Sequence, residues 1–101
     1  MQSQFELMLE RVFLLINDET GESRRFVIKM GRPYWTEPEV EAACPIIIEG
    51  LLDRQQEIFG IDPLDAIEMA IKFLNSFLSE RPATEKVCWS TGDPYFDNEQ
   101  G

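Results

Sequence analysis

The chain has 101 residues, of which 44% are hydrophobic and 11% aromatic, a size and composition that predict one globular domain whose core forms without metals or disulfides. Nineteen acidic residues oppose nine basic ones, and the formal net charge is -10. This surplus repels phosphate backbones, so nucleic acid is excluded as an expected partner. The same charge favours solubility and is compatible with a basic protein partner.

The chain contains two cysteines, Cys44 and Cys88, and no histidine. Two thiols are too few for a disulfide framework, although a single bridge between them stays open. The N-terminal stretch lacks a basic region before its apolar run, so no secretory signal is predicted. No segment approaches 18 uninterrupted apolar residues, the length that would indicate a membrane span. We therefore expect a cytoplasmic protein with reduced thiols.

Two apolar segments, Phe5–Ile16 and Arg24–Met30, predict a β-hairpin. The first also fits the period of a helix, so periodicity alone does not decide its structure. The turn formers of Asn17–Ser23 and the alternation of the second segment favour two strands. Gly31 and Pro33 then break the pairing, because proline lacks the N–H that a central strand needs.

The middle of the chain predicts less regular structure. Residues 32–39 are expected to form a loop or a crossing at a strand end. A third strand is expected to start at Val40 and to end at Gly50, and Pro45 inside it indicates an edge or bulged strand. Residues 53–60 predict a loop or a short helical turn.

The segment from Asp62 to Glu80 predicts one helix. Asp62 suits the N-cap, and Pro63 suits the first helical position because its missing N–H is no loss there. The helix should end ahead of Pro82. Its main apolar stripe consists of Leu64, Ile67, Ile71, Leu74 and Leu78, widened by Ala66, Ala70, Phe73 and Phe77. A stripe this wide predicts a helix that lies across a sheet.

A last short strand is expected from Glu85 to Thr91, followed by a frayed acidic tail from about residue 93. The predicted fold is α+β, an antiparallel sheet of about four strands with one long helix packed on one face, in the order β-β-β-α-β. Because no repeat or linker-like composition divides the chain, residues 1–101 are expected to form a single domain.

The sequence lacks most motifs that carry catalytic chemistry. Without histidine there is no Ser-His-Asp or Cys-His arrangement, and two cysteines do not complete a four-thiolate zinc site. No glycine-rich phosphate loop occurs, and Asp93, Asp97 and Asn98 depart from the spacing of a calcium loop. Cys44 and Cys88 are interpreted as small buried hydrophobic residues. No catalytic, cofactor-binding or metal-binding residue is predicted.

The best candidate site is a group of aromatic residues in predicted loops or at strand ends. Their convergence on one face would make an interaction patch, since Trp and Tyr are favoured anchors at interfaces. The alternative is that they close the open end of a small core. The candidate patch consists of Tyr34, Trp35, Trp89, Tyr95 and Phe96.

Three stretches, "ACPIIIEGL", "GIDPLDAIEMAIKFL" and "VCWSTGD", resemble a small bacterial domain family of unknown function. In that family a hairpin ending in Gly-x-Pro, here Gly31-Arg32-Pro33, precedes a Cys-containing strand, a Gly-Ile-Asp helix and a Trp-containing last strand. The resemblance covers about Glu10 to Asp93 and implies a fold without an activity. Proteins of this size and type also occur as mobile gene-cassette products and as toxin-neutralising immunity proteins.

We therefore expect a small acidic, non-enzymatic protein-interaction module, immunity-like or a gene-cassette product, with no cofactor. Its partner would be another protein, or a second copy in a homodimer paired through open sheet edges. The rival is a small-molecule-binding or enzymatic domain with a pocket between helix and sheet, lined by Tyr34, Trp35 and Trp89. A pocket holding two converging carboxylates would favour the rival, and a flat acidic or aromatic face would favour the interaction module.

Overall fold

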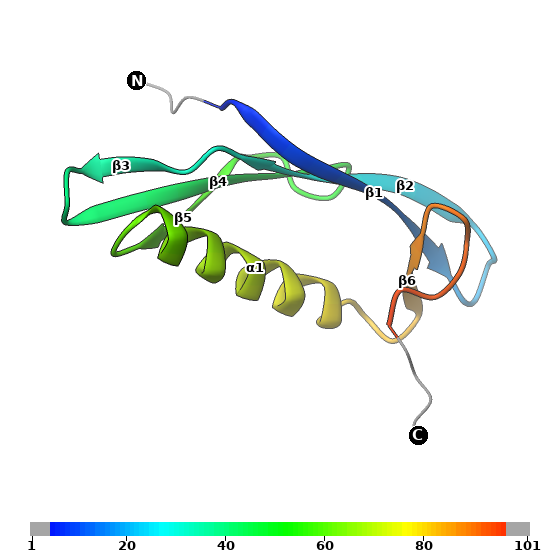
Figure 1. Cartoon of the computed structure of the whole chain (residues 1–101). Coiled ribbons are helices and arrows are strands. Elements are labelled where there is room, and N and C mark those ends of the chain that lie inside the picture. Colours follow the sequence, from blue (N-terminus) through cyan, green and yellow to red (C-terminus); the bar gives the residue numbers. More distant parts are fainter. Residues whose placement is uncertain (1–4, 97–101) are drawn as a thin grey trace.

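The computed structural model describes residues 5–96, which form an antiparallel sheet with a helix on one of its faces (Figure 1). The elements are β1 (Leu7–Asn17), β2 (Ser23–Gly31), β3 (Tyr34–Glu37), β4 (Glu41–Glu49), β5 (Gln56–Gly60), α1 (Pro63–Ser79) and β6 (Glu85–Trp89). The α+β prediction with one helix on one face is confirmed for this part of the chain. The sheet has six strands, however, instead of about four.

The hairpin of β1 and β2 forms the middle of the sheet. The two strands pair in register from Ile16↔Ser23 to Leu9↔Met30, and a bulge lies between Leu7 and Leu9. β4 lies on the other side of β2 from β1. Residues 41–43 of β4 pair with β3, and residues 46–49 pair with β2. β5 pairs with β4, and β6 pairs with β1. The strand prediction for the first segment is therefore confirmed.

Two segments predicted as loops or turns are strands. β3 pairs through Tyr34 and Trp35 with Ala43 and Ala42 of β4. β5, which was predicted as a loop or helical turn, pairs with residues 42–46 of the same strand. Both strands are short, and their pairing depends on β4 more than on their own residue patterns, because strand formation is strongly set by neighbouring strands.

Pro45 does not mark an edge strand, because β4 has neighbours on both sides. Pro45 pairs with Glu57 of β5, while its other side faces the interruption between β2 and β3. A Cβ on Gly31 would lie 2.7 Å from the Pro45 Cγ atom. The missing side chain of Gly31 therefore leaves room for the Pro45 ring. The predicted break at Gly31 and Pro33 lies beside Pro45, so β4 contains a proline where it has no β2 or β3 partner.

The helix α1 starts as predicted. The Asp62 Oδ1 atom accepts a hydrogen bond of 2.7 Å from the Asp65 N–H, and Pro63 occupies the first turn. In return, Asp65 Oδ2 accepts a hydrogen bond of 2.9 Å from the Ile61 N–H. The first bond satisfies a backbone donor that a helix start leaves unpaired, and the second ties the residue ahead of the N-cap to the first turn.

The face that α1 turns toward the sheet differs from the predicted main stripe. Ala66, Ala70 and Leu78 are buried, but Leu64 is 66% exposed and Ile71 is 48% exposed. Alanine has the smallest apolar side chain with a Cβ, so the helix approaches β5 and β4 closely along Ala66 and Ala70. Leu64 and Ile71 lie on one flank of the helix, where the sheet covers them only in part.

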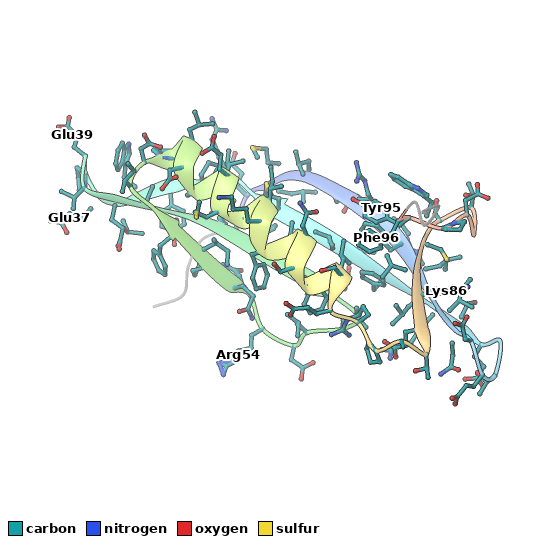
Figure 2. The ribbon with its side chains drawn as sticks, turned by 90° about the horizontal axis from the view of Figure 1, so that it is seen from below. Glu37, Glu39, Arg54, Lys86, Tyr95 and Phe96 are labelled. Carbon is teal, nitrogen blue, oxygen red and sulfur yellow. The ribbon has the colours of Figure 1, made fainter. Side chains whose placement is uncertain are left out.

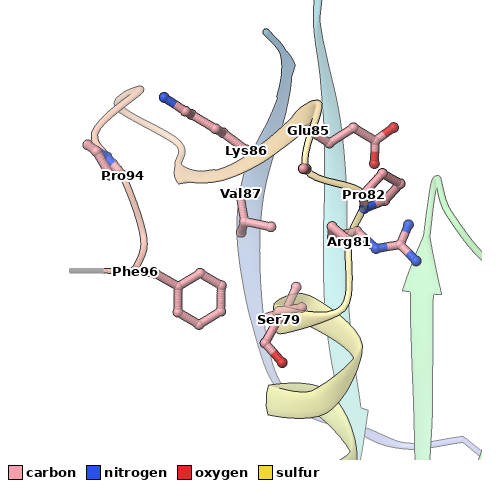
Figure 3. A pocket seen from close by; sticks show the side chains of 10 residues that line it. Ser79, Arg81, Pro82, Glu85, Lys86, Val87, Pro94 and Phe96 are labelled. Carbon is pink, nitrogen blue, oxygen red and sulfur yellow. The ribbon is translucent and has the colours of Figure 1, made fainter. Parts of the chain in front are cut away.

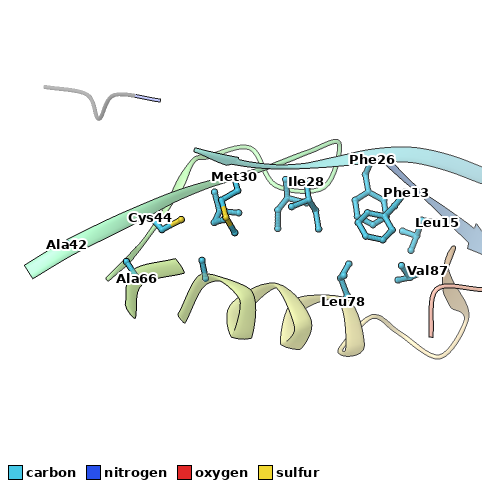
Figure 4. Close-up of a cluster of buried hydrophobic side chains, with 13 residues drawn as sticks. Phe13, Leu15, Phe26, Ile28, Met30, Ala42, Cys44, Ala66, Leu78 and Val87 are labelled. Atoms are coloured by element: carbon cyan, nitrogen blue, oxygen red, sulfur yellow. The ribbon is translucent and has the colours of Figure 1, made fainter. Parts of the chain in front are cut away.

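The hydrophobic core lies between the sheet and α1 (Figure 4). Phe13 of β1 and Phe26 of β2 stack with their ring centroids 5.1 Å apart. Ile46 and Ile48 of β4 are fully buried beside them. The core therefore joins the central strands to the helix and leaves the first half of β1 outside it.

Candidate interaction groove

An apolar groove of about 610 Å³ lies between β1 and α1. Strand residues form one wall and the flank of the helix forms the other. Its lining residues are Met8, Leu9, Glu10, Arg11, Phe13, Ile28, Met30, Ile67, Ile71, Leu74, Asn75, Leu78 and Tyr95. Most of these side chains are apolar, and several are markedly exposed, so the groove is an uncovered hydrophobic surface.

The groove follows from the placement of a single helix on a wider sheet. α1 packs against β5 and β4. A helix with its side chains is about 10 Å across, whereas neighbouring strands lie about 4.8 Å apart. One helix therefore covers only part of this sheet, and the helix-side face near the first half of β1 has no helix over it within residues 5–96.

The first half of β1 also has an open edge. β6 pairs with β1 only from Phe13 to Asn17. In the described part of the chain, no strand pairs with residues 7–12 on that side. Leu7 is 51%, Met8 43% and Leu9 54% exposed. An exposed apolar edge strand is a template for pairing with another chain.

Among the described lining residues of this groove, Arg11 is the only positively charged one. Its guanidinium lies 4.9 Å from the centre of the Trp89 ring, and its Nη1 donates a hydrogen bond of 3.4 Å to Tyr95 Oη. No carboxylate within residues 5–96 forms an ion pair with it. The groove therefore presents one positive charge that the described side chains leave without a negative partner.

The structure divides the five predicted aromatic residues between two places. Tyr95 contacts both Trp89 and Phe96 near β6, with ring centroids 4.9 Å apart for Trp89–Tyr95 and 5.1 Å apart for Tyr95–Phe96. Tyr34 and Trp35 belong to β3, at the opposite end of the sheet (Figures 1 and 2). Only the first group borders the groove, through Tyr95.

Sequence reasoning missed the groove residues on β1 and on the flank of α1. Met8 and Leu9 were assigned to a strand face, and Ile71 and Leu74 were assigned to the buried stripe. The available signal was the width of the helical stripe, which is broader than one contact with a sheet needs.

A smaller cavity of about 320 Å³ lies between the end of α1 and β6 (Figure 3). Arg81 Nε and Glu85 Oε1 are buried there without a hydrogen-bond partner among the described residues. The Arg81 guanidinium lies 4.5 Å from the centre of the Phe77 ring. Among residues 5–96, Glu85 is the only acidic residue that lines this cavity, so the described lining holds no pair of converging carboxylates.

Both cysteines are free and buried, so the structure shows no bridge between them. Burial and the nearby Glu57 carboxylate raise the pKa of the Cys44 thiol to about 11. Burial also raises the pKa of Cys88. The thiolate is therefore disfavoured at both positions.

We predict that Cys44 resists thiol reagents in the folded protein. A pKa of about 11 in place of 9.0 lowers the thiolate fraction at pH 8 about 100-fold, before burial blocks the reagent. Labelling with a chromogenic disulfide should be slow in buffer. It should be complete in about 6–8 M urea, a concentration that unfolds most small domains. Rapid labelling of Cys44 in the folded protein would contradict this.

The raised pKa also makes stability depend on pH. Since the folded state holds the Cys44 thiol protonated, the contribution of this thiol to stability is full below pH 9.0 and declines as the pH rises toward 11.

Within residues 5–96, no group of three or more cysteine, aspartate or glutamate side chains is arranged to hold a metal ion. None of the helical structure described there is long and apolar enough to cross a bilayer.

Comparisons of the chain with models of protein families, with curated proteins and with solved structures find no match. The resemblance to a small bacterial domain family therefore stays a prediction, and the groove is interpreted from its own residues.

Proposed function

We propose that this protein is a non-enzymatic protein-interaction module that receives a partner protein in the groove between β1 and α1. The observation that carries the proposal is the groove itself, where exposed apolar residues of two different elements line one space of about 610 Å³. A contiguous exposed apolar surface on a small domain is typical of an interaction site.

The surface charge supports a protein partner that is basic overall. The formal charge of -10 would attract such a partner and speed its association, and salt would weaken this attraction. An immunity-like role, in which the protein blocks a basic toxin, is one form of this function.

A small-molecule-binding or catalytic pocket is the second candidate, since the groove has the size and apolar lining of many ligand sites. Glu10 is the only carboxylate among the described lining residues, so residues 5–96 do not supply the pair of carboxylates that acid–base chemistry would use. The open edge of β1 also suits a polypeptide better than a compact ligand, because a strand edge offers a row of backbone groups.

We expect a photo-crosslinking residue at Ile71 to capture a discrete protein in the cells that make this chain. Ile71 is 48% exposed and lines the groove, whereas Ile61 is 72% exposed and lies outside it. The same crosslinker at Ile61 is the matched control. Adducts would be resolved by mass and digested with protease to show that they are protein.

A second change, Leu9→Asp, places a charge on the opposite wall of the groove and should abolish the adduct formed from Ile71. Thermal unfolding would show that this exposed substitution leaves the fold intact. Equal adducts from Ile71 and Ile61, or no protein adduct at Ile71, would show that the groove is not a protein-binding site. An adduct of small-molecule mass at Ile71 would favour the second candidate.

A further inference from the structure

We propose that the partner enters the groove as an extended segment, which pairs with the free edge of β1 and places a carboxylate opposite Arg11. This inference rests on the proposed function and specifies how the partner binds and which chemistry it presents. It names the partner by a pattern of residues: an extended stretch with an apolar side chain opposite Leu9 and an Asp or Glu opposite Arg11.

The position beside β1 is half filled by the chain itself. β6 occupies it from Glu85, opposite Asn17, to Trp89, opposite Phe13. The chain then turns back on itself, since the Trp89 N–H bonds to Asp93 O at 2.8 Å and the Gly92 N–H bonds to Trp89 O at 2.9 Å. The pairing of β6 with β1 therefore ends at Phe13. Six residues of β1, 7–12, continue past it, a length of about 20 Å at 3.3 Å per residue.

The backbone of β1 is oriented to accept such a segment. The Asn17 N–H bonds to Glu22 O on the β2 side, and the Asp18 N–H bonds to Thr84 O on the β6 side. Backbone groups alternate between the two edges along a strand, and the pairing with β2 is regular from Ile16 back to Leu9. The N–H and C=O groups of Glu10 and Val12 therefore point to the open edge.

The side chains of an added strand would fill the groove. Arg11 pairs with Ile28, and Leu9 pairs with Met30, and both partners belong to the core on the helix side of the sheet. Residues that sit opposite one another on neighbouring strands point to the same face. Segment residues opposite Leu9 and Arg11 would thus project beneath the sheet, toward the exposed flank of α1 at Ile71.

Arg11 sets the chemistry at one of these positions. Trp89 fills the position opposite Phe13, and because the chain turns after Trp89, no residue of 5–96 pairs at the next position on the same face, opposite Arg11. A carboxylate there would pair with the guanidinium across the strands, a favourable arrangement for opposite charges. The Trp89 ring, 4.9 Å from the guanidinium, would hold Arg11 beside it.

A second copy of this chain fits the edge less well. Two-fold pairing centred on Glu10 or on Arg11 would place like charges directly opposite each other, which is unfavourable. Pairing centred on Leu9 would meet the bulge between Leu7 and Leu9. Each copy also carries a formal charge of -10. The edge therefore favours a different chain over a homodimer.

The test is selection of binders from a displayed library of random 12-residue peptides, carried out on the full chain. Recovered peptides should alternate apolar residues with an Asp or Glu at a fixed spacing. Selection on Arg11→Glu should replace that acid by Lys or Arg. A synthetic peptide selected on the original protein should bind Arg11→Glu about fivefold more weakly, the upper end of the range for a cross-strand charge pair.

The pair Glu10→Pro and Glu10→Ala separates edge pairing from other modes of binding. Proline removes the edge-facing N–H and is tolerated at that side of an edge strand, so Glu10→Pro should weaken the peptide at least about tenfold relative to Glu10→Ala. Thermal unfolding would confirm that both variants fold. The variant Asp97→Asn/Glu99→Gln controls for competition by the chain's own acidic residues that follow Phe96.

The outcomes distinguish this inference from the function on which it rests. If Glu10→Pro and Glu10→Ala bind the peptide equally while Ile71→Asp abolishes binding, the partner uses the groove without pairing with β1, for example as an amphipathic helix, and the inference is wrong. If the library yields no binder, the inference of an extended segment is wrong, while the crosslinking at Ile71 still decides the proposed function. If binders are recovered and Ile71→Asp has no effect on them, the groove is not the protein-binding site and both proposals fail. Light scattering that shows a dimer lost in Glu10→Pro would assign the edge to self-association instead.

Discussion

Replacing Phe13 with alanine should lower the free energy of unfolding by about 3–5 kcal/mol, the range for removing a large aromatic side chain from a core. Phe13 is 1% exposed. Its ring contacts Phe26 at 5.1 Å and Tyr95 at 5.0 Å between centroids, and Trp89 at 6.4 Å. These contacts tie β1 to β2 and to the segment around β6, so the cavity left by alanine would weaken all of them.

The measurement is equilibrium unfolding in urea, followed by tryptophan fluorescence and by circular dichroism. Phe59→Ala is the matched control, because the same side chain is 52% exposed on β5. It should change the free energy of unfolding by less than about 1 kcal/mol, as surface substitutions usually do. Similar losses in the two variants would show that the core is not centred on Phe13.

Phe13 also marks the boundary between two differently packed halves of β1. From Phe13 onward, β1 is paired on both edges and its helix-side residues are buried. Before Phe13, no strand of the described residues pairs with one edge, and Leu7, Met8 and Leu9 are exposed. The second half of β1 therefore anchors the first half in the sheet, and under our proposal the first half offers the edge to which a partner segment pairs.

Features set by residues close in sequence were predictable. The start of α1 depends on Asp62, Pro63 and Asp65, which lie within one turn of the helix, and the hairpin of β1 and β2 depends on the turn between them. β3 and β5 were not predictable in this way, because each is stabilised by pairing with β4. Their short length leaves little periodicity to detect.

The groove could be predicted only in part. The apolar stripe of α1 was visible in the sequence, but its burial was not, since the closeness of Ala66 and Ala70 to β5 and β4 decides which flank stays exposed. The edge of β1 was also invisible, because it depends on where the chain turns after Trp89. Arg11 gave no signal either: an arginine in an alternating strand is ordinary until its neighbours are known.

Replacing Gly60 with alanine should lower the free energy of unfolding by about 3 kcal/mol, near the upper end of the range for overpacking. A Cβ on Gly60 would lie 2.5 Å from the Ala66 N atom and 2.8 Å from the Asp65 backbone carbon. Both are backbone atoms of the first turn of α1, so neither moves without shifting the helix. The same Cβ would lie 2.8 Å from Asp65 Oδ2, the atom that accepts the Ile61 N–H hydrogen bond.

Urea unfolding of Gly60→Ala would be compared with Ile61→Ala, which changes the next residue, 72% exposed, and should be nearly neutral. If the two variants were equally stable, β5 would not approach α1 as closely as the structure places it. The alignment of the helix along Ala66 and Ala70 would then lose its cause. That alignment leaves Ile71 uncovered. The helical wall of the groove therefore depends on the absence of a side chain at Gly60, the last residue of β5.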